Sequence, residues 1–294
     1  MNAAAAAGKA TLLYAADVSG DKVYVYDYRS GMLVGTLKGF NEPGPGCVDR
    51  RGDVFITNYG NGKVLQFKNG GTEPVGRYDA GAYAVGCSVD RDGDLAVSAE
   101  PPPSGAAQIC VWKSGGGTRL CYSQAACGTM GAPGYDDRGN LYLEGFYAGP
   151  AICELPAGGS SLRPVAISGG TLGTPGGVMW DGKHLTFSDP HTGPDGHETT
   201  IYRARESASG DLTVVGATLL TDRCNDDYAW IDAPFIVGRK NTPVNDRQGK
   251  TVVGPNNVCD PAPIDFWPYT AGANPSRVWT QGYSAGSAIV SIGS

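Results

Sequence analysis

The densest group of side chains that could bind a metal ion lies in one short segment, DPHTGPDGHE, at residues 189–198. It contains two imidazoles, His191 and His197, and two aspartates, Asp189 and Asp195. Nitrogen and oxygen ligands of this kind bind divalent cations, so the segment is a candidate site for one calcium or zinc ion. The same composition is also typical of a solvated polar loop, which needs no cofactor.

A second group of side chains suits a small polar ligand. Carboxylates and amides beside aromatic rings recognise sugars and other small polar organic molecules. The residues of this kind that we expect at one mouth of the molecule are Glu42, Asn58, Glu100, Tyr147, Asp226, Asp227, Tyr228 and Tyr283. The alternative is that the aromatic residues only pack between structural units.

Two other motifs could in principle carry chemistry. Gly282–Gly286 matches G-x-S-x-G, but a nucleophilic Ser284 requires a sharp turn from a strand into a helix, and a strand-like run follows instead. The segment Asp90–Asp94, DRDGD, resembles a calcium loop. Its place in a repeated unit predicts a hairpin turn, and we expect His184, at a strand start, to be structural.

The repeated unit is clearest from Gly46 to Phe67, where GCVDRRGDVFITNYGNGKVLQF reads as three short strands separated by turns. Further copies begin near Gly86, Gly134 and Gly176. A glycine recurs in the first turn of each unit, at Gly52, Gly93, Gly139, Gly182, Gly249 and Gly293. A tight hairpin turn needs a positive φ, which glycine adopts without steric cost. A period of about 40–45 residues with several short strands is typical of a propeller blade.

Six units predict an all-β, six-bladed β-propeller: a tail at residues 1–10 and one domain at 11–294. The last strand-like run, SAIVSIG, should close the ring by placing Ile289 beside Leu12–Ala16. Before blade six the period lengthens, and its inner strand is either Tyr228–Asp232 or Pro234–Gly238. The irregular loops gather on one face of such a ring, which is therefore the candidate functional face.

Charge and hydropathy exclude several classes of partner. The net charge is −6, which argues against nucleic acid as the main partner. No apolar run reaches the roughly 18 residues of a membrane span. The first residues, MNAAAAAGKA, lack the charged and apolar regions of a signal peptide. We expect a monomer.

The eight cysteines nevertheless predict export, to the periplasm or the exterior, because an even count in a turn-rich chain favours disulfides. Cys110 and Cys121 would face each other across a hairpin, and Cys47 and Cys87 hold the same place in neighbouring inner strands. Cys224 and Cys259 would lie in loops on one face, which leaves Cys127 and Cys153. A zinc site is the alternative, but no C-x2-C pair is present.

The units GCVDRRGDVFITNYGNGKVLQF and GYDDRGNLYLEG resemble NHL-type repeats. The six-unit ring also resembles the superfamily of gluconolactonase-like and streptogramin-lyase-like propellers. The resemblance to the lactonases implies one metal on the ring axis, held by Glu, Asn and Asp residues just before the inner strands. The matching positions are Pro45, Val85, Gly131, Pro175 and Ala285, which cannot ligate through side chains, so only Asn225–Asp227 is suitable. The resemblance to peptide-amidating lyases implies histidines from separate blades around zinc, whereas two of the three histidines here share one loop.

Together these observations predict an exported, disulfide-braced propeller that binds a small polar ligand, a glycan or a protein partner on its loop-rich face. The alternative is a metal-dependent hydrolase or lyase of the lactonase-like or streptogramin-lyase-like type. A third possibility is a purely structural or surface-interaction module.

Overall fold

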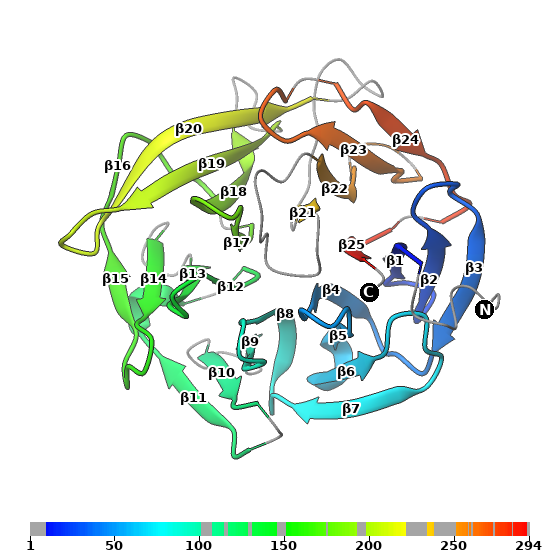
Figure 1. Ribbon diagram of the computed structural model, residues 1–294, viewed down its shortest axis with the longest axis horizontal. Helices are drawn as coiled ribbons and strands as arrows, with labels where there is room; N and C mark the ends of the chain where they lie inside the picture. Colours follow the sequence, from blue (N-terminus) through cyan, green and yellow to red (C-terminus); the bar gives the residue numbers. More distant parts are fainter. Residues whose placement is uncertain are drawn as a thin grey trace.

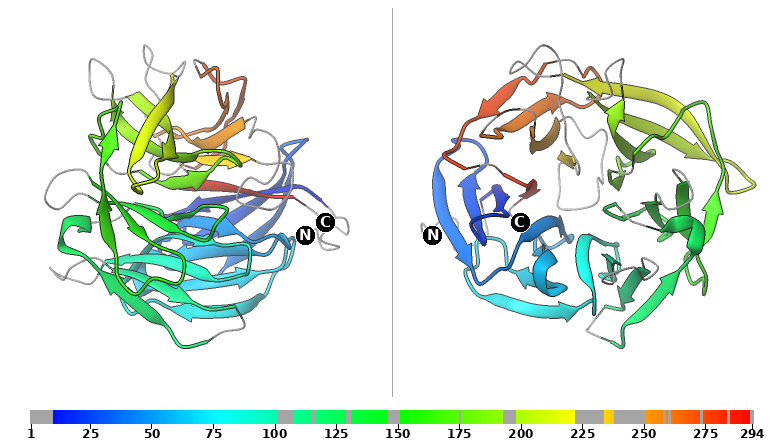
Figure 2. Two further views of the ribbon diagram at one scale, coloured as in Figure 1. Left: turned by 60° about the vertical axis from the view of Figure 1, so that its left-hand side comes forward. Right: turned by 180° about the vertical axis from the view of Figure 1, so that it is seen from behind.

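The computed structural model describes residues 10–100, 108–114, 117–128, 131–145, 151–174, 176–192, 198–221, 234–237, 251–257, 259, 261–272, 274–283 and 285–292. These residues form six antiparallel sheets arranged as blades around a central axis (Figure 1). The predicted six-bladed β-propeller is therefore confirmed. Figure 2 shows the same ring turned by 60° and seen from behind.

Each blade has four antiparallel strands, the first of which lies nearest the axis. Blade one contains β25 (Ser287–Ser291), β1 (Leu12–Asp17), β2 (Lys22–Asp27) and β3 (Leu33–Lys38). Blade two contains β4 (Pro43–Val48), β5 (Val54–Asn58), β6 (Lys63–Phe67) and β7 (Pro74–Asp79). Blade three contains β8 (Tyr83–Val89), β9 (Leu95–Glu100), β10 (Gln108–Trp112) and β11 (Leu120–Ser123).

Blade four contains β12 (Gly134–Tyr135), β13 (Leu141–Gly145), β14 (Ala151–Leu155) and β15 (Arg163–Val165). Blade five contains β17 (Val178–Trp180), β18 (Leu185–Thr192), β19 (Glu198–Glu206) and β20 (Leu212–Leu220). Blade six contains β21 (Phe235–Val237), β22 (Thr251–Pro255), β23 (Ile264–Pro268) and β24 (Arg277–Trp279). Of the two candidate inner strands for blade six, the structure therefore has the one within Pro234–Gly238, and Tyr228–Asp232 lies outside the described residues.

The C-terminal strand closes the ring as predicted, because β25 pairs antiparallel with β1 and places Ile289 opposite Tyr14. The Tyr14 hydroxyl then links blade one to blade two. It donates to Asn69 Oδ1 at 3.1 Å and accepts the Gly70 N–H at 2.7 Å. The chain ends thus share one sheet, and a hydrogen-bonded side chain joins that sheet to its neighbour.

In blades two to five, the first turn is built around an aspartate that directly follows the inner strand. Asp49, Asp90, Asp136 and Asp181 each accept two backbone N–H bonds from the turn that follows. The turn glycine has a positive φ, as at Gly93, where φ is 90°. The segment Asp90–Asp94 is therefore a capped hairpin turn, in agreement with the sequence-based interpretation. His184 is also structural, since its Nδ1 lies 3.2 Å from Asp181 Oδ2 just before β18.

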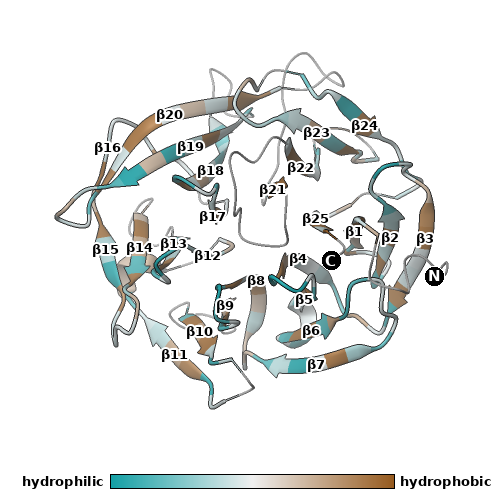
Figure 3. Cartoon of the chain, in the orientation of Figure 1, coloured by the Kyte–Doolittle hydropathy of each residue, from teal (hydrophilic) through white to brown (hydrophobic). Residues whose placement is uncertain are grey.

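Apolar side chains fill the six spaces between neighbouring blades. Each space holds one buried cluster drawn from the two sheets on either side, such as Phe55 and Val64 with Val89 and Val97 between blades two and three. Figure 3 shows apolar residues recurring along the strands of every blade. The ring is therefore stabilised mainly by burial of apolar surface between sheets.

Blade five departs from the regular pattern. Its strands β19 and β20 have nine residues each, and Figure 1 shows them running along the outside of the ring. A short strand, β16 (Ile167–Ser168), pairs parallel with β20 before the chain reaches β17. The sequence pattern did not predict this fifth strand.

Candidate functional site

A ring of polar residues marks the loop-rich face. Each second strand has an acidic or amide residue in its second half or directly after it: Asp17, Asn58, Glu100, Glu144, Asp189 and Asn256. All except Glu100 are buried. The position therefore places a hydrogen-bonding side chain beneath the loops of each blade.

These side chains hold the backbone of the surrounding loops. Asn58 Oδ1 accepts the Asn41 N–H at 2.6 Å, in the segment that leads to β4. Asp189 accepts the N–H groups of Gly173 and of Thr174, the latter at 3.1 Å, in the segment that leads to β17. Buried polar groups need such partners, so these residues have a structural role.

Glu144 is the exception within this ring. Its side chain is fully buried, and its Oε2 accepts the Gly176 N–H at 2.7 Å across the boundary to blade five. No described residue forms a hydrogen bond with Oε1. Burial raises the pKa of Glu144 well above its ordinary value, and the nearby charge of Asp189 raises it further. Sequence reasoning missed Glu144, which takes the place in its strand that Thr57, Ser98 and Ser188 have in other blades.

The structure describes two of the four predicted metal ligands, Asp189 and His191. Besides its two bonds to the preceding loop, Asp189 accepts the His191 N–H at 3.0 Å, so its oxygens already bind backbone groups. His197 and Asp195 lie outside the described residues. Within the described part of the chain, no three His, Cys, Asp or Glu side chains could hold one ion together. The metal therefore stays a prediction.

Three predicted ligand-binding residues, Glu42, Asn58 and Glu100, lie near the boundary between blades two and three. Tyr59, which follows Asn58 in the 3-10 turn η1 (Tyr59–Asn61), stacks on Tyr83 with a centroid separation of 4.8 Å and an interplanar angle of 12°. Tyr83 begins β8 and pairs in register with Glu100. We call Glu42, Tyr59, Tyr83 and Glu100 the tyrosine–glutamate corner.

The backbone positions Glu42 in this corner. Its carbonyl accepts the Tyr59 N–H at 3.0 Å, and its own N–H donates to Asp21 Oδ1 at 2.8 Å. Its φ is 55°, an uncommon conformation for a residue with a side chain, and such conformations often occur at functional sites. The loop is thus held in a left-handed conformation that projects an exposed carboxylate beside Tyr59.

The charges of the corner act on Tyr59. Partial burial raises the pKa of its hydroxyl, and the carboxylates of Glu100 and Glu42 add to the increase. The Tyr59 side chain is nevertheless 36% exposed. An accessible aromatic face beside two carboxylates is an environment that favours a positively charged group. The sequence did not single out Tyr59, because it lies in a turn motif.

Of the remaining predicted ligand-binding residues, the structure describes only Tyr283, which does not join this corner. Tyr283 packs between blades six and one, where it stacks on Tyr24 at 4.2 Å and its hydroxyl lies 3.0 Å from that of Tyr26. For Tyr283 the structure therefore matches the alternative of packing between units. The other four, Tyr147, Asp226, Asp227 and Tyr228, lie outside the described residues, as does Ser284.

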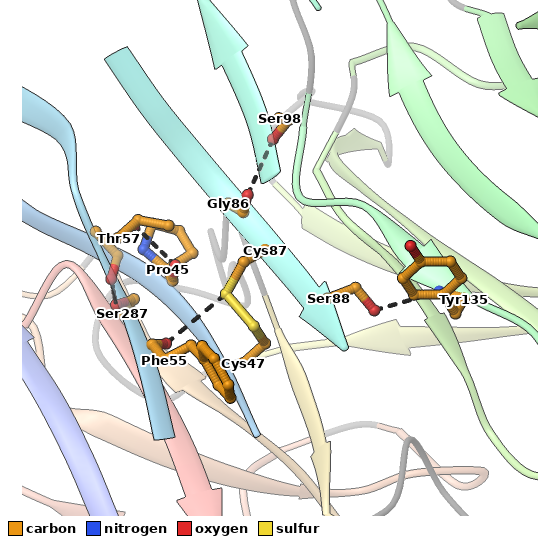
Figure 4. The surroundings of a disulfide bond; sticks show 11 residues. Pro45, Cys47, Phe55, Thr57, Gly86, Cys87, Ser88, Ser98, Tyr135 and Ser287 are labelled. Atoms are coloured by element: carbon orange, nitrogen blue, oxygen red, sulfur yellow. Dashed lines mark hydrogen bonds between the residues drawn. A yellow bond between two sulfur atoms is a disulfide. The ribbon is translucent and has the colours of Figure 1, made fainter. Parts of the chain in front are cut away.

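Three of the four expected disulfides are present: Cys47–Cys87, Cys110–Cys121 and Cys127–Cys153. Figure 4 shows the first of these between β4 and β8, the inner strands of blades two and three. Cys259 is also disulfide-bonded, and its expected partner Cys224 lies outside the described residues. The disulfides indicate an oxidising environment.

Among the described residues, no helix has the length and apolar character needed to cross a bilayer. Comparison with known sequences gives no family model and no curated protein that matches this chain.

Solved structures do resemble it. A chain of a nidogen/laminin complex superposes with a TM-score of 0.67 at 14% identity, over 96% of this chain and 99% of that one. TolB from Acinetobacter baumannii superposes with a TM-score of 0.62 at 11% identity, over 96% of this chain and 66% of that one. Hydrazine synthase from Kuenenia stuttgartiensis superposes with a TM-score of 0.60 at 13% identity, over 86% of this chain and 73% of that one. At these identities the likeness shows the fold alone, a six-bladed β-propeller, which is a fold suited to binding ligands or proteins.

Proposed function

We propose that this protein is an exported binding protein whose loop-rich face takes a small polar molecule that carries a positive charge. The observation that carries the proposal is the stacked pair Tyr59–Tyr83, set between the carboxylates of Glu42 and Glu100 at the boundary of two blades. Export is supported by the disulfides, because cytosolic proteins rarely keep them.

The corner combines two modest attractions. A cation over an exposed aromatic face contributes about 0.5–1 kcal/mol, and more when it loses water. An exposed ion pair contributes about 0–1 kcal/mol. A ligand with one cationic group would therefore bind weakly through this corner, with a dissociation constant above about 1 mM, since that value already needs about 4 kcal/mol.

A calorimetric titration with choline tests the proposal, with its neutral isostere 3,3-dimethyl-1-butanol and glucose as matched probes. We expect choline alone to bind. Tyr59→Ala and Glu100→Gln should weaken its binding at least fivefold, whereas Glu73→Gln, at an exposed glutamate outside the corner, should not change it.

Three outcomes would contradict the proposal. Equal binding of the neutral isostere would remove the role of charge. Binding of glucose alone would favour a glycan-binding face. Absence of binding by all three probes would leave a protein partner or a structural role for this face.

A further inference from the structure

The face of the ring that carries the first turns of the blades, opposite the loop-rich face, has a pocket between blades three and four. Its volume is about 350 Å³, within the range of pockets that take small organic ligands, about 300–1,000 Å³. The wall combines the first turn and the outer strands of blade three with the hairpin turns of blade four. The charged residues that line it are Asp90, Asp92, Asp94, Lys113 and Arg138.

The equivalent first turn of blade two contains a complete set of charge partners. Asp49 Oδ2 accepts hydrogen bonds from Arg51 Nε at 3.1 Å and from Arg51 Nη2 at 3.0 Å. Asp53 Oδ2 accepts a hydrogen bond from Lys68 Nζ at 2.9 Å. Both carboxylates are buried. One guanidinium and one ammonium group therefore balance the two buried charges of this turn.

The first turn of blade three lacks one of these partners. Asp94 Oδ2 accepts a hydrogen bond from Lys113 Nζ at 2.6 Å, so the ammonium group is present. The guanidinium is not, because Asp92 takes the place of Arg51 and the sequence DRRGD becomes DRDGD. Asp90 Oδ1 accepts its two backbone N–H bonds, but no described residue forms a hydrogen bond or an ion pair with Asp90 Oδ2.

The corresponding oxygen has a partner in the two other turns of this type. Asp136 Oδ2 accepts a hydrogen bond from Arg138 Nε at 3.3 Å. Asp181 Oδ2 accepts one from the Tyr269 hydroxyl at 2.8 Å. Within the described part of the chain, Asp90 therefore differs from all three of its counterparts.

Asp90 is a buried carboxylate that lines the pocket, and it is only 8% exposed. Burial raises its pKa, and the charges of Asp94 and Asp92 raise it further against the effect of the backbone N–H bonds. A buried charge is unfavourable unless it is paired. The pocket thus presents an acidic group that a cation from outside the chain would stabilise.

The two cations of the wall are already engaged elsewhere. Lys113 pairs with Asp94, and Arg138 forms ion pairs with Asp136 and Glu206. An added cation would therefore meet Asp90 without displacing an existing partner of its Oδ2.

The remaining wall suits the rest of an arginine-like side chain. Tyr122 is a partly exposed aromatic residue, and the apolar side chains of the wall are Val111, Leu120, Leu141 and Leu155. A guanidinium group pairs with carboxylates and stacks on aromatic rings, and its alkyl chain packs on apolar surface. We propose that this pocket binds the guanidinium group of a small molecule with an arginine-like side chain, in the place that Arg51 has in blade two. The proposal does not rest on the proposed function of the loop-rich face.

Calorimetric titration with Nα-acetyl-L-arginine amide tests this site, with Nα-acetyl-L-citrulline amide as its uncharged isostere. The titrations use the Tyr59→Ala variant, so that binding of a cation at the tyrosine–glutamate corner is weakened. We expect saturable binding of the arginine compound and at least fivefold weaker binding of the citrulline compound.

Asp92→Arg, added to this chain, is the sharpest variant, because it gives the turn the sequence of blade two. The chain then supplies its own guanidinium to Asp90. We expect at least fivefold weaker binding of the arginine compound together with a higher midpoint of thermal unfolding. Asp90→Asn should also weaken binding at least fivefold. Glu73→Arg is the matched control, since it makes the same change of charge at an exposed position outside the pocket, and it should change binding less than twofold.

The proposal is overturned if the arginine compound shows no saturable binding, or if the citrulline compound binds as tightly. It is also overturned if Asp92→Arg or Asp90→Asn, folded as judged by thermal unfolding, binds the arginine compound as tightly as the parent chain. A lower unfolding midpoint for Asp92→Arg would contradict the missing guanidinium even without a ligand. Equal weakening by Glu73→Arg would show that only the overall charge matters.

Discussion

The boundary between blades two and three and the boundary between blades four and five join their inner strands in different ways. Blades two and three are linked covalently by Cys47–Cys87. Blades four and five are linked by backbone hydrogen bonds, from Ala132 N–H to Gly176 O at 3.1 Å and from Val178 N–H to Ala132 O at 2.8 Å. The same place in the ring thus has a disulfide in one case and a short parallel bridge in the other.

The bridge requires glycine, whereas the disulfide requires only two suitably placed cysteines. A Cβ at Gly131 would lie 2.3 Å from the Gly176 carbonyl oxygen, and a Cβ at Gly134 would lie 2.4 Å from that of Val178. Atoms do not approach so closely, so a side chain at either position would force the strands apart. Close backbone approach therefore stabilises the boundary of blades four and five, whereas a covalent bond stabilises the boundary of blades two and three.

The polar residues of the loop-rich face also differ between the two blade boundaries. The tyrosine–glutamate corner leaves its carboxylates near solvent, whereas Glu144 and Asp189 are buried where blades four and five meet. Exposed carboxylates remain available to a ligand, whereas Glu144 and Asp189 accept hydrogen bonds from the backbone of neighbouring loops. The comparison indicates that the corner is suited to binding and that the Glu144 region supports the ring.

The largest effect should come from removing the inter-blade disulfide. The double substitution Cys47→Ser and Cys87→Ser opens a link across 40 residues and should lower the free energy of unfolding by about 4 kcal/mol. Guanidinium unfolding, followed by tryptophan fluorescence, measures the change.

Cys110→Ser with Cys121→Ser is the matched control, because this disulfide spans 11 residues within one hairpin and should contribute about 3 kcal/mol. A larger loss from the control than from the inter-blade pair would refute the importance of the link between blades two and three.

A smaller effect is expected at the boundary of blades four and five. Gly131→Ala should lower the free energy of unfolding by about 1–3 kcal/mol, because its methyl group would overlap the Gly176 carbonyl. Gly177→Ala, in the facing segment just before β17, would place its methyl group 3.3 Å from the Ala132 side chain and 3.7 Å from the Ala132 carbonyl oxygen, so it should change stability by less than about 1 kcal/mol. Equal unfolding midpoints for the two variants in a urea titration would show that the close approach does not matter.

The smallest change in the free energy of unfolding should come from Glu144→Gln at low pH. This change should grow as the pH rises. The pKa of Glu144 is raised in the folded protein, so its contribution to stability is complete below the unfolded value of about 4.5 and is lost as the pH rises through the folded value. The Gln side chain keeps an acceptor for the Gly176 N–H but does not ionise. The variant should therefore gain stability relative to the wild type as the pH rises from about 4 to about 8.

Urea unfolding at several pH values measures this difference. Glu73→Gln, at an exposed position, is the control and should leave the pH profile unchanged. Parallel profiles for the wild type and Glu144→Gln would exclude ionisation of Glu144 as a source of the pH dependence.

Most of the fold was predictable from local sequence. The turn glycines and the alternation of strands and turns depend on residues close together in the chain, so their pattern can be read directly. Ring closure followed from the incomplete units at the two ends of the chain, and the pairing of β25 with β1 confirms it. The pairing Cys47–Cys87 followed from equivalent places in neighbouring inner strands, and Cys110–Cys121 followed from a hairpin between the two cysteines; both are confirmed. The parallel strand β16 did not follow, because it has no counterpart in the other blades.

Less of the candidate site was predictable. The sequence identified Glu42, Asn58 and Glu100 as polar residues on one face, but not that Tyr59 stacks on Tyr83. It also gave no sign that Glu144 would be buried with one oxygen that has no hydrogen-bond partner among the described residues, or that Gly131 permits a bridge between blades. These features depend on the contact between one sheet and the next. The sequence by itself determined the blades and their order, and only the tertiary structure decided which side chains meet at their boundaries, because packing between sheets sets those distances.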